Sequence, residues 1–361
     1  MHKRKGELVM ATVSRGKSNW ANASARSKAR KAKLIDATQM RQLLLQEPDA
    51  MASSIAEMGY GTELNKYATR LSGADLVEAA LNHNMDQDLI QVLGFCQGHL
   101  KDLVSIYVER YAYQKVKTAL RAVRSGVSNE MVASQVLAEE NDANSQWLEV
   151  VRNSNTLSDA VSALAGTKFG KALTSVEETD DLMALEDALD RQYYHDATNK
   201  LRAGGSSHPQ LLRYLRTEID HRNVTNLFRA LKQSLPSEDR NKLMLQGGYA
   251  LNSTNLRQAA EANNEEALVE ILRRAPNFND GGFDEALVAY RENGTLDPIV
   301  NILTEQRTVL MNRMATLHPL SAFPVINYVE RKACEVANLR LMVRGRAAGL
   351  SDEVIEAHLK I

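Results

Sequence analysis

The residues with the clearest chemical spacing are Glu218 and His221, which form an E-x-x-H that places a carboxylate and an imidazole on one helical face. Helical di-iron sites use two such pairs together with two further carboxylates. The sequence contains no second E-x-x-H. We therefore expect no metal site, and we interpret His221 as a residue at the surface or at the edge of a core.

Three other stretches contain residue types that catalytic sites use. Residues 166–172 (GTKFGKA) resemble a phosphate-binding loop, but they are one residue short of G-x-x-x-x-G-K-[ST] and lack its hydroxyl. Residues 204–207 (GGSS) lack the G-x-S-x-G pattern and predict a flexible connection. Residues 193–195 (YYH) are more typical of helix packing. The sequence thus predicts no catalytic residue, cofactor or small-molecule substrate, and it favours an interaction protein.

The elements that carry these residues are predicted to be helices. Proline is absent between Pro48 and Pro209, and this stretch is rich in residues that favour helices. No stretch alternates apolar and polar residues as a half-buried strand would. The expected fold class is therefore all-α.

The C-terminal segment shows the helical period. Apolar residues gather on one face, namely Ile326, Val329, Ala333, Val336 and Val343. Polar residues are expected to face mostly away from it, namely Arg331, Lys332, Glu335 and Arg346. Pro324 suits the first turn of this helix, Gly349 suits its C-terminal cap, and Ser351 is expected to cap a short last helix.

Internal similarity organises the chain. The aromatic residues Tyr60, Phe169 and Phe278 follow similar segments at separations of 109 and 109 residues. Helical stretches that open at Glu109, Glu218 and Glu330 recur at 109 and 112 residues. We predict three helical units, over residues 19–127, 128–236 and 237–361, preceded by a flexible basic extension over residues 1–18.

Charge is unevenly distributed. Residues 1–33 carry ten Lys or Arg against the single Glu7, whereas the whole chain has a formal net charge of −1. Such an arm is most often a solvated tail, and anionic lipid or nucleic acid are the alternative partners. Trp20 is the arm's only aromatic residue, so a platform for stacking bases is lacking and we expect no nucleic-acid partner.

The cysteines indicate the cellular compartment, and the apolar runs indicate how the protein can contact a membrane. Cys96 and Cys334 are 238 positions apart and have no neighbours at metal-ligand spacing, which favours a reducing compartment. The apolar run at residues 8–13 is too short for a membrane span. We expect a soluble protein whose membrane association is at most peripheral.

Three stretches resemble the C subunit of archaeal-type (A-type/V-type) rotary ATP synthases, which is related to the d subunit of vacuolar ATPases. They are residues 23–35 (ASARSKARKAKLI), residues 218–232 (EIDHRNVTNLFRALK) and residues 318–359, which contain the family's E-x-x-N-L-R…G pattern. The residues that carry these patterns are Glu218, Asn226, Glu330, Glu335, Asn338, Arg340 and Gly345. The first predicted repeat, residues 19–127, has Lys117 and Thr118 where the later repeats have Asn-Leu, and residues 1–18 extend beyond the usual start.

The resemblance implies three helical domains around a pseudo-threefold axis, forming a funnel without an active site. Such a protein would sit peripherally on the cytoplasmic face of the membrane, and would bind the central-stalk subunits and the proteolipid rotor ring. We expect the pattern residues to cap, pair and fix helices inside each repeat, with direct contact to a partner as the alternative. Five basic residues are candidates for a membrane-facing rim, or for pairing with the acidic remainder of the chain: Arg26, Lys28, Arg30, Lys31 and Lys33. A generic helical scaffold, or a helical enzyme with an unrecognised site, are the alternatives.

Overall fold

A computed structural model describes residues 16–126, 145–203 and 208–360, and every regular element within these ranges is a helix. The all-α prediction is confirmed. Contacts divide the chain into two compact units. Unit 1 combines the residues up to Glu186 with those from Pro319 onward, and unit 2 spans Asp187–His318. This division reflects contact density and not internal similarity, so the three repeat units remain a prediction.

Unit 1 contains helices from both ends of the chain. They are α1 (Trp20–Lys31), α2 (Ala37–Leu44), α3 (Pro48–Ile55), the π-helix η1 (Ala56–Tyr60), α4 (Gly61–Tyr67), α5 (Gly73–Phe95), α6 (Gly98–Val108), α7 (Arg110–Ser125), α9 (Ser145–Asn153), α10 (Leu157–Leu164), α11 (Gly170–Leu173), α19 (Phe323–Ala347) and α20 (Asp352–Ala357). Helix α12 (Leu182–Ala203) crosses the boundary between the units.

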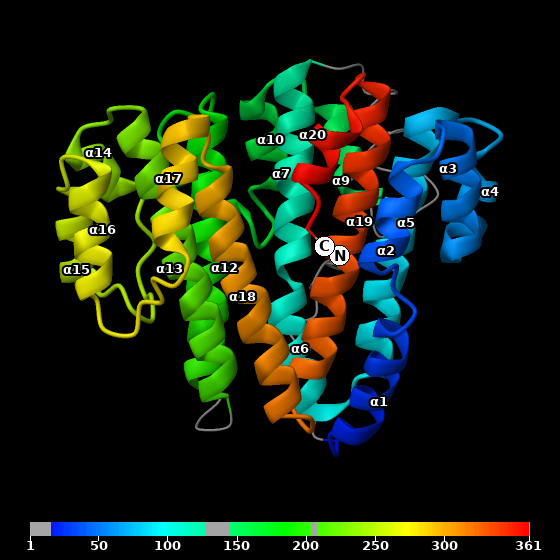
Figure 1. The fold of residues 1–361 in the computed structure, drawn as a ribbon, viewed down its shortest axis with the longest axis horizontal. Coiled ribbons are helices and arrows are strands. Elements are labelled where there is room, and N and C mark those ends of the chain that lie inside the picture. Colours follow the sequence, from blue (N-terminus) through cyan, green and yellow to red (C-terminus); the bar gives the residue numbers. More distant parts are fainter. Residues whose placement is uncertain (1–15, 127–144, 204–207, 361) are drawn as a thin grey trace, which may run out of the picture. The chain divides into compact units, whose positions relative to one another are not determined.

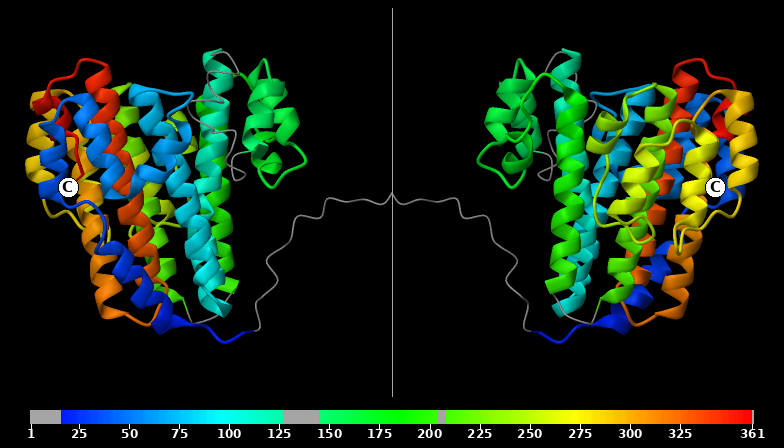
Figure 2. Two further views of the ribbon diagram at one scale, coloured as in Figure 1. Left: turned by 90° about the vertical axis from the view of Figure 1, so that its right-hand side faces the viewer. Right: turned by 90° about the vertical axis from the view of Figure 1, so that its left-hand side faces the viewer.

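Helices α5 and α19 form the centre of unit 1 and lie side by side, and α1 packs against α19 (Figure 1). Both long helices bury residues around most of their circumference, which is typical of a helix inside a core. The short helices α9 and α10 pack on α7 (Figure 2). The N-terminal and C-terminal parts of the sequence therefore share one core.

The C-terminal helix differs from the prediction at two positions. Ile326, Val329 and Val336 are buried as expected. Lys332 and Glu335 were expected to face solvent but are only 7% and 5% exposed, because α1 and α5 cover the side of α19 that a single amphipathic face would leave open. The periodicity of one helix does not reveal how many neighbours surround it.

The predicted helix ends are confirmed. Pro324 lies in the first turn of α19. Gly349 follows this helix with a left-handed φ of 76°, a conformation that glycine adopts without steric cost. The Ser351 side chain accepts a hydrogen bond from the amide of Val354 and caps α20.

Two helix junctions in unit 1 have the same close approach. A Cβ atom on Gly61 would lie 3.0 Å from the carbonyl oxygen of Ala56, and one on Gly170 would overlap the carbonyl oxygen of Ala165. Each glycine follows one of the buried repeat aromatics, Tyr60 and Phe169. The third repeat aromatic, Phe278, is partly buried against the core of unit 2.

Unit 2 contains most of α12 followed by six complete helices. They are α13 (Pro209–Lys232), α14 (Ser237–Lys242), α15 (Ser253–Ala260), α16 (Glu265–Arg274), α17 (Phe283–Asn293) and α18 (Asp297–Leu317). Its apolar core joins the C-terminal half of α13 to α15, α16, α17 and the start of α18. Helices α13 and α18 also pack directly on each other.

No described helix combines the length and the apolar content that a membrane span needs. Both cysteines are free thiols, and burial raises the pKa of Cys96 to about 11.

Candidate functional site

The predicted pattern residues on α19 surround a buried carboxylate. Glu335 Oε2 accepts a hydrogen bond from the amide of Ile35 at 2.6 Å. Its Oε1 accepts from the Tyr60 hydroxyl at 2.5 Å and from Lys332 Nζ at 2.9 Å. Lys332 also donates to the Tyr60 oxygen at 2.7 Å. Burial and the Glu335 charge raise the pKa of Tyr60 well above its ordinary value, so this hydroxyl stays a donor.

One turn further along α19, Asn338 holds the end of the chain. Its side-chain amide donates to the carbonyl of Lys360 at 3.0 Å, and its oxygen accepts from the amide of Lys360 at 2.9 Å. Glu335 and Asn338 thus fix two backbone segments, one after α1 and one after α20. Together they fasten the N-terminal and C-terminal parts of unit 1 to one helix.

Arginines of α19 pair with acidic residues of α5. Arg340 lies 3.2 Å from Glu78 and donates to Asn82. Arg344 bonds the same carboxylate at 2.5 Å and Asp75 at 2.7 Å. These shared pairs form a network, and a network restrains the sliding of two helices better than one isolated surface pair does.

The remaining pattern residues of α19 have simpler surroundings. Gly345 allows α20 to approach, because a Cβ there would lie 2.9 Å from the side chain of Ile355. Glu330 is half-buried and lies 3.8 Å from Arg110.

The five predicted rim residues on and after α1 have different surroundings. Arg26 stacks over the Phe95 ring at 4.6 Å, and Arg30 bonds Asp88 at 2.6 Å. Burial, followed by the nearby Arg331 charge, lowers the pKa of Lys31. Lys28 and Lys33 are exposed. The cluster is therefore divided, because Arg26 and Arg30 contact side chains of α5, whereas Lys28 and Lys33 are exposed.

The basic extension is described only at its end. Residues 1–15 lie outside the described residues, so its predicted mobility is untested there. Ser18 is in contact with the fold, since its hydroxyl accepts a hydrogen bond from the amide of Leu100.

Unit 2 repeats the α19 arrangement on α13, with residues that the sequence comparison missed. Asn223 bonds both backbone groups of Leu245 at 2.8 Å, and the two residues are 22 positions apart, as Asn338 and Lys360 are. Three residues earlier, Asp220 accepts hydrogen bonds from the amides of Tyr249, Ala250 and Leu251 at 2.7–3.1 Å. The signal was present, because D-x-x-N on α13 matches E-x-x-N on α19.

The predicted pair Glu218 and Asn226 has other roles. Glu218 is buried and lies 3.9 Å from Arg307 of α18. Asn226 is half-buried and accepts a weak bond from Arg229 at 3.5 Å. Aligning Glu218 with Glu330 gives an offset of 112 residues, whereas the hydrogen bonds match at an offset of 115, about one helical turn away.

Two neighbours on α13 have shifted pKa values in opposite directions. Burial raises the pKa of Asp220 to about 6, although the three amides and Arg216 favour its charged form. Burial, followed by the Arg307 charge, lowers the pKa of His221 to about 4. His221 is thus a buried neutral imidazole at pH 7; of the two predicted positions, the surface is excluded, because the residue is only 7% exposed.

Two of the other stretches with residue types that catalytic sites use contain residues that contact neighbouring side chains in the fold. Lys168 of the phosphate-loop-like stretch bonds Glu109 at 2.8 Å and lies over the Phe169 ring. Tyr193 and Tyr194 pack edge to face. Residues 204–207 lie outside the described residues. Within the described ranges, no three His, Cys, Asp or Glu side chains come together as a metal site.

The chain is similar to known proteins along almost its whole length. Residues 23–358 match the family model described as ATP synthase (C/AC39) subunit. The chain is 32% identical to the C subunit of the A-type ATP synthase of Haloquadratum walsbyi, covering 94% of this chain and 97% of the relative. It is 31% identical to the corresponding protein of Haloferax volcanii (96% and 99% covered) and 27% identical to that of Methanococcoides burtonii (95% and 95% covered).

Proposed function

Because this chain belongs to the ATP synthase (C/AC39) subunit family, we propose that it is the rotor component that joins the central stalk of an A-type ATP synthase to the proteolipid ring. It is an accessory subunit of the complex and not a catalytic one. The observation that carries the proposal is the family match over residues 23–358, together with similarity along almost the whole length of the relatives. In this role it transmits torque in either direction of operation.

The proposed architecture is a funnel of three helical units, over residues 19–127, 128–236 and 237–361, around a pseudo-threefold axis. Two observations support internal repetition. The Ala56–Gly61 and Ala165–Gly170 junctions share a close approach at a spacing of 109 residues. The acid-x-x-Asn arrangements of α13 and α19 share a bonding pattern at 115 residues. Repeated units with similar interfaces can surround a shaft.

A torque coupler must resist deformation. Packed helices have low compressibility, and the interior hydrogen bonds of α13 and α19 tie each helix to backbone segments outside it. The pairs between α5 and α19 resist sliding along the helix axes. These features support a stiff body in unit 1 and in unit 2.

We place the protein at the cytoplasmic face of the cell membrane, attached peripherally through its partners. Of the five basic rim candidates, Arg26, Lys28 and Lys33 are exposed, and Arg26 stacks on Phe95, so Lys28 and Lys33 are best suited to contact a ring loop or anionic head groups. Such contacts weaken as salt rises.

The proposal is tested by measuring ATP hydrolysis and ion transport side by side in complexes reconstituted with and without this chain. Hydrolysis by the soluble sector should persist without it, because no residue here is assigned to nucleotide. Ion transport should be lost, because the shaft then lacks its connection to the ring. Full ion transport in the absence of the chain would overturn the proposal.

A further inference from the structure

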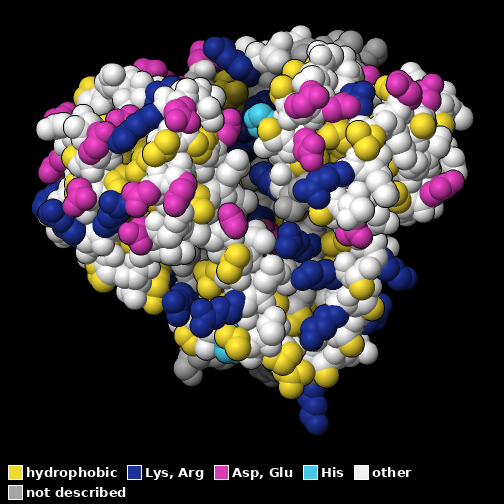
Figure 3. Space-filling model, in the orientation of Figure 1, with side chains coloured by type: hydrophobic (Ala, Val, Ile, Leu, Met, Phe, Trp, Pro, Cys, Tyr) yellow, Lys and Arg dark blue, Asp and Glu magenta, His cyan; other side chains and the backbone are white. Residues whose placement is uncertain are grey.

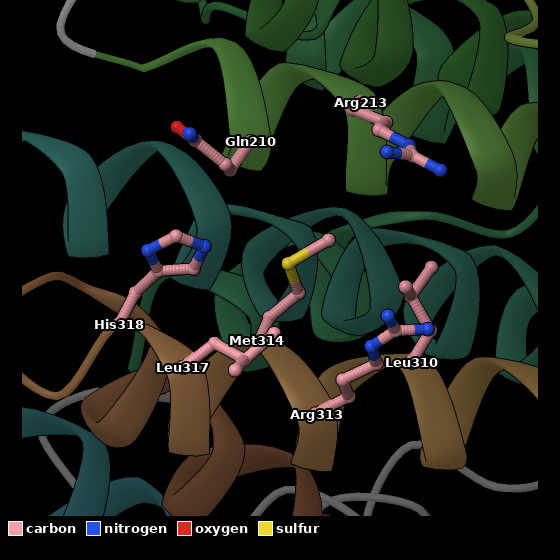
Figure 4. Close-up of a pocket in the computed structure, with 7 residues that line it drawn as sticks. All are labelled: Gln210, Arg213, Leu310, Arg313, Met314, Leu317 and His318. Atoms are coloured by element: carbon pink, nitrogen blue, oxygen red, sulfur yellow. The ribbon is translucent and has the colours of Figure 1, made fainter.

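A pocket of about 300 Å³ lies within unit 2, between the start of α13 and the C-terminal half of α18 (Figure 4). It is separate from the buried clusters described above. The lining residues are Gln210, Arg213, Leu310, Arg313, Met314, Leu317 and His318.

The pocket combines an apolar floor with a basic rim. Met314 points between the two helices, with Arg213 and Arg313 on one side of it and His318 on the other (Figure 4). Leu317 contributes apolar surface and is 59% exposed. In the space-filling view, Lys and Arg side chains gather beside hydrophobic side chains over this part of α13 and α18 (Figure 3). Pockets that place a few polar groups around apolar surface are typical binding sites.

The two arginines of the rim are not neutralised within the described residues. The lining contains no carboxylate, and neither Arg213 nor Arg313 forms an ion pair with a described side chain. Both arginines are exposed. Arg213 is held in place by stacking over the Tyr249 ring, 4.7 Å from its centroid. A guanidinium pairs readily with a carboxylate in two parallel hydrogen bonds, which makes this rim complementary to an acidic occupant.

We infer that this pocket binds a short acidic and apolar segment of another protein in the complex. A carboxylate of that segment pairs with Arg213 and Arg313, and an adjacent aliphatic side chain packs on Leu310, Met314 and Leu317. The volume is at the lower end for ligand pockets and suits one or two side chains better than the two acyl chains of a phospholipid. The inference rests on the proposed function, since it assigns one contact within the same complex.

The first test compares two double charge reversals in the full chain. R213E/R313E changes the pocket, and R229E/R257E changes two exposed arginines of unit 2 outside it. Each variant is titrated onto solubilised complexes that lack this protein. We expect binding at least tenfold weaker for the pocket variant and within twofold of the unsubstituted chain for the control. If the reversal unfolds the chain, R213Q/R313Q replaces it with the same expectation of weaker binding.

The second test identifies the occupant. A photo-reactive benzoylphenylalanine at Leu317 is cross-linked within the reconstituted complex, and the attached peptide is sequenced by mass spectrometry. A partner segment with Asp or Glu beside Leu, Ile or Val supports the inference. A cross-link to a basic segment or to lipid overturns it. The inference also fails if R213E/R313E loses binding to vesicles of phosphatidylcholine and phosphatidylglycerol but still binds the complex normally.

The two proposals fail in different ways. If the unsubstituted chain does not join the complex, the proposed function fails, and this inference with it. If the unsubstituted chain joins and both double variants join equally well, only the pocket assignment is wrong.

Discussion

Helix α19 in unit 1 and helix α13 in unit 2 carry the same acid-x-x-Asn arrangement, but the two acids bond residues at very different separations in sequence. On α19 the acid bonds Ile35 and Tyr60, which are 300 and 275 positions away. On α13 the acid bonds three amides that are 29 to 31 positions away. The asparagine acts alike in both, bonding one backbone residue 22 positions further on.

The difference lies in how each buried acid is compensated. Glu335 faces a buried ammonium group from Lys332, whereas Asp220 faces three backbone amides and has Arg216 as a nearby cation. A buried charge pair is sensitive to losing one partner, because the remaining charge is left without water. A carboxylate held by amides is instead sensitive to its own protonation.

The largest expected effect is a loss of stability when the buried acid of α19 is neutralised. Glu335→Gln should lower the free energy of unfolding by about 3–5 kcal/mol, because it leaves the Lys332 charge buried without its carboxylate. Chemical denaturation of the full chain measures this. The combined change Lys332→Met with Glu335→Gln should recover most of the loss, and a double variant as unstable as the single one would refute the charge-pair explanation.

The next prediction concerns pH and applies to α13. Asp220 has a raised pKa when folded, so its contribution to stability is full below about pH 4 and is lost as pH rises to about 6. His221 has a lowered pKa, so its contribution is full above pH 6.5 and is lost as pH falls to about 4. The two contributions have opposite slopes and largely cancel in the natural chain.

Single substitutions should expose each slope. As pH rises from 4 to 6.5, Asp220→Asn should gain stability relative to the natural chain, and His221→Gln should lose it. Each relative change should be about 3 kcal/mol, because each pKa differs by roughly two between the folded and the unfolded chain. Amide exchange in α13 across this pH range measures both, and parallel slopes for the two variants would contradict the assignment.

A smaller difference in stability is expected between alanine variants of the two asparagines, Asn223 and Asn338. Asn223→Ala should cost about 2–3 kcal/mol, because Asn223 is 0% exposed and both backbone groups of Leu245 would lose their partner inside the core. Asn338→Ala should cost about 1 kcal/mol, because water can reach the partly buried Lys360 backbone. Thermal unfolding of the two variants gives the ratio, and equal losses would show that the chain end is held as firmly as the internal loop.

The smallest effect is expected at Asn226, the residue that the sequence alignment pairs with Asn338. Asn226→Ala should change stability by no more than about 0.5 kcal/mol, since its bond to Arg229 is long and exposed. The same unfolding experiment serves as the measurement. A loss as large as that of Asn223→Ala would restore the 112-residue alignment.

The helical class, the helix ends marked by Pro324, Gly349 and Ser351, and the family could all be predicted from the amino-acid sequence. These features depend on local spacing, on the conformations that individual residues allow, or on a long pattern of matching residues. The sequence also identified Glu335 and Asn338 as pattern residues without indicating what they bond.

Three features were decided only in the folded chain: the burial of Lys332 and Glu335, the choice of Asp220 and Asn223 over Glu218 and Asn226 as the match to α19, and the pocket beside Arg213. Helical periodicity reports one face of one helix, whereas α19 is covered by neighbours on several sides. The repeat offset is ambiguous by one turn because residues three or four apart share a face, and only hydrogen-bond partners distinguish 112 from 115. A concave surface exists only once α13 and α18 are packed, so no single stretch of sequence carries it.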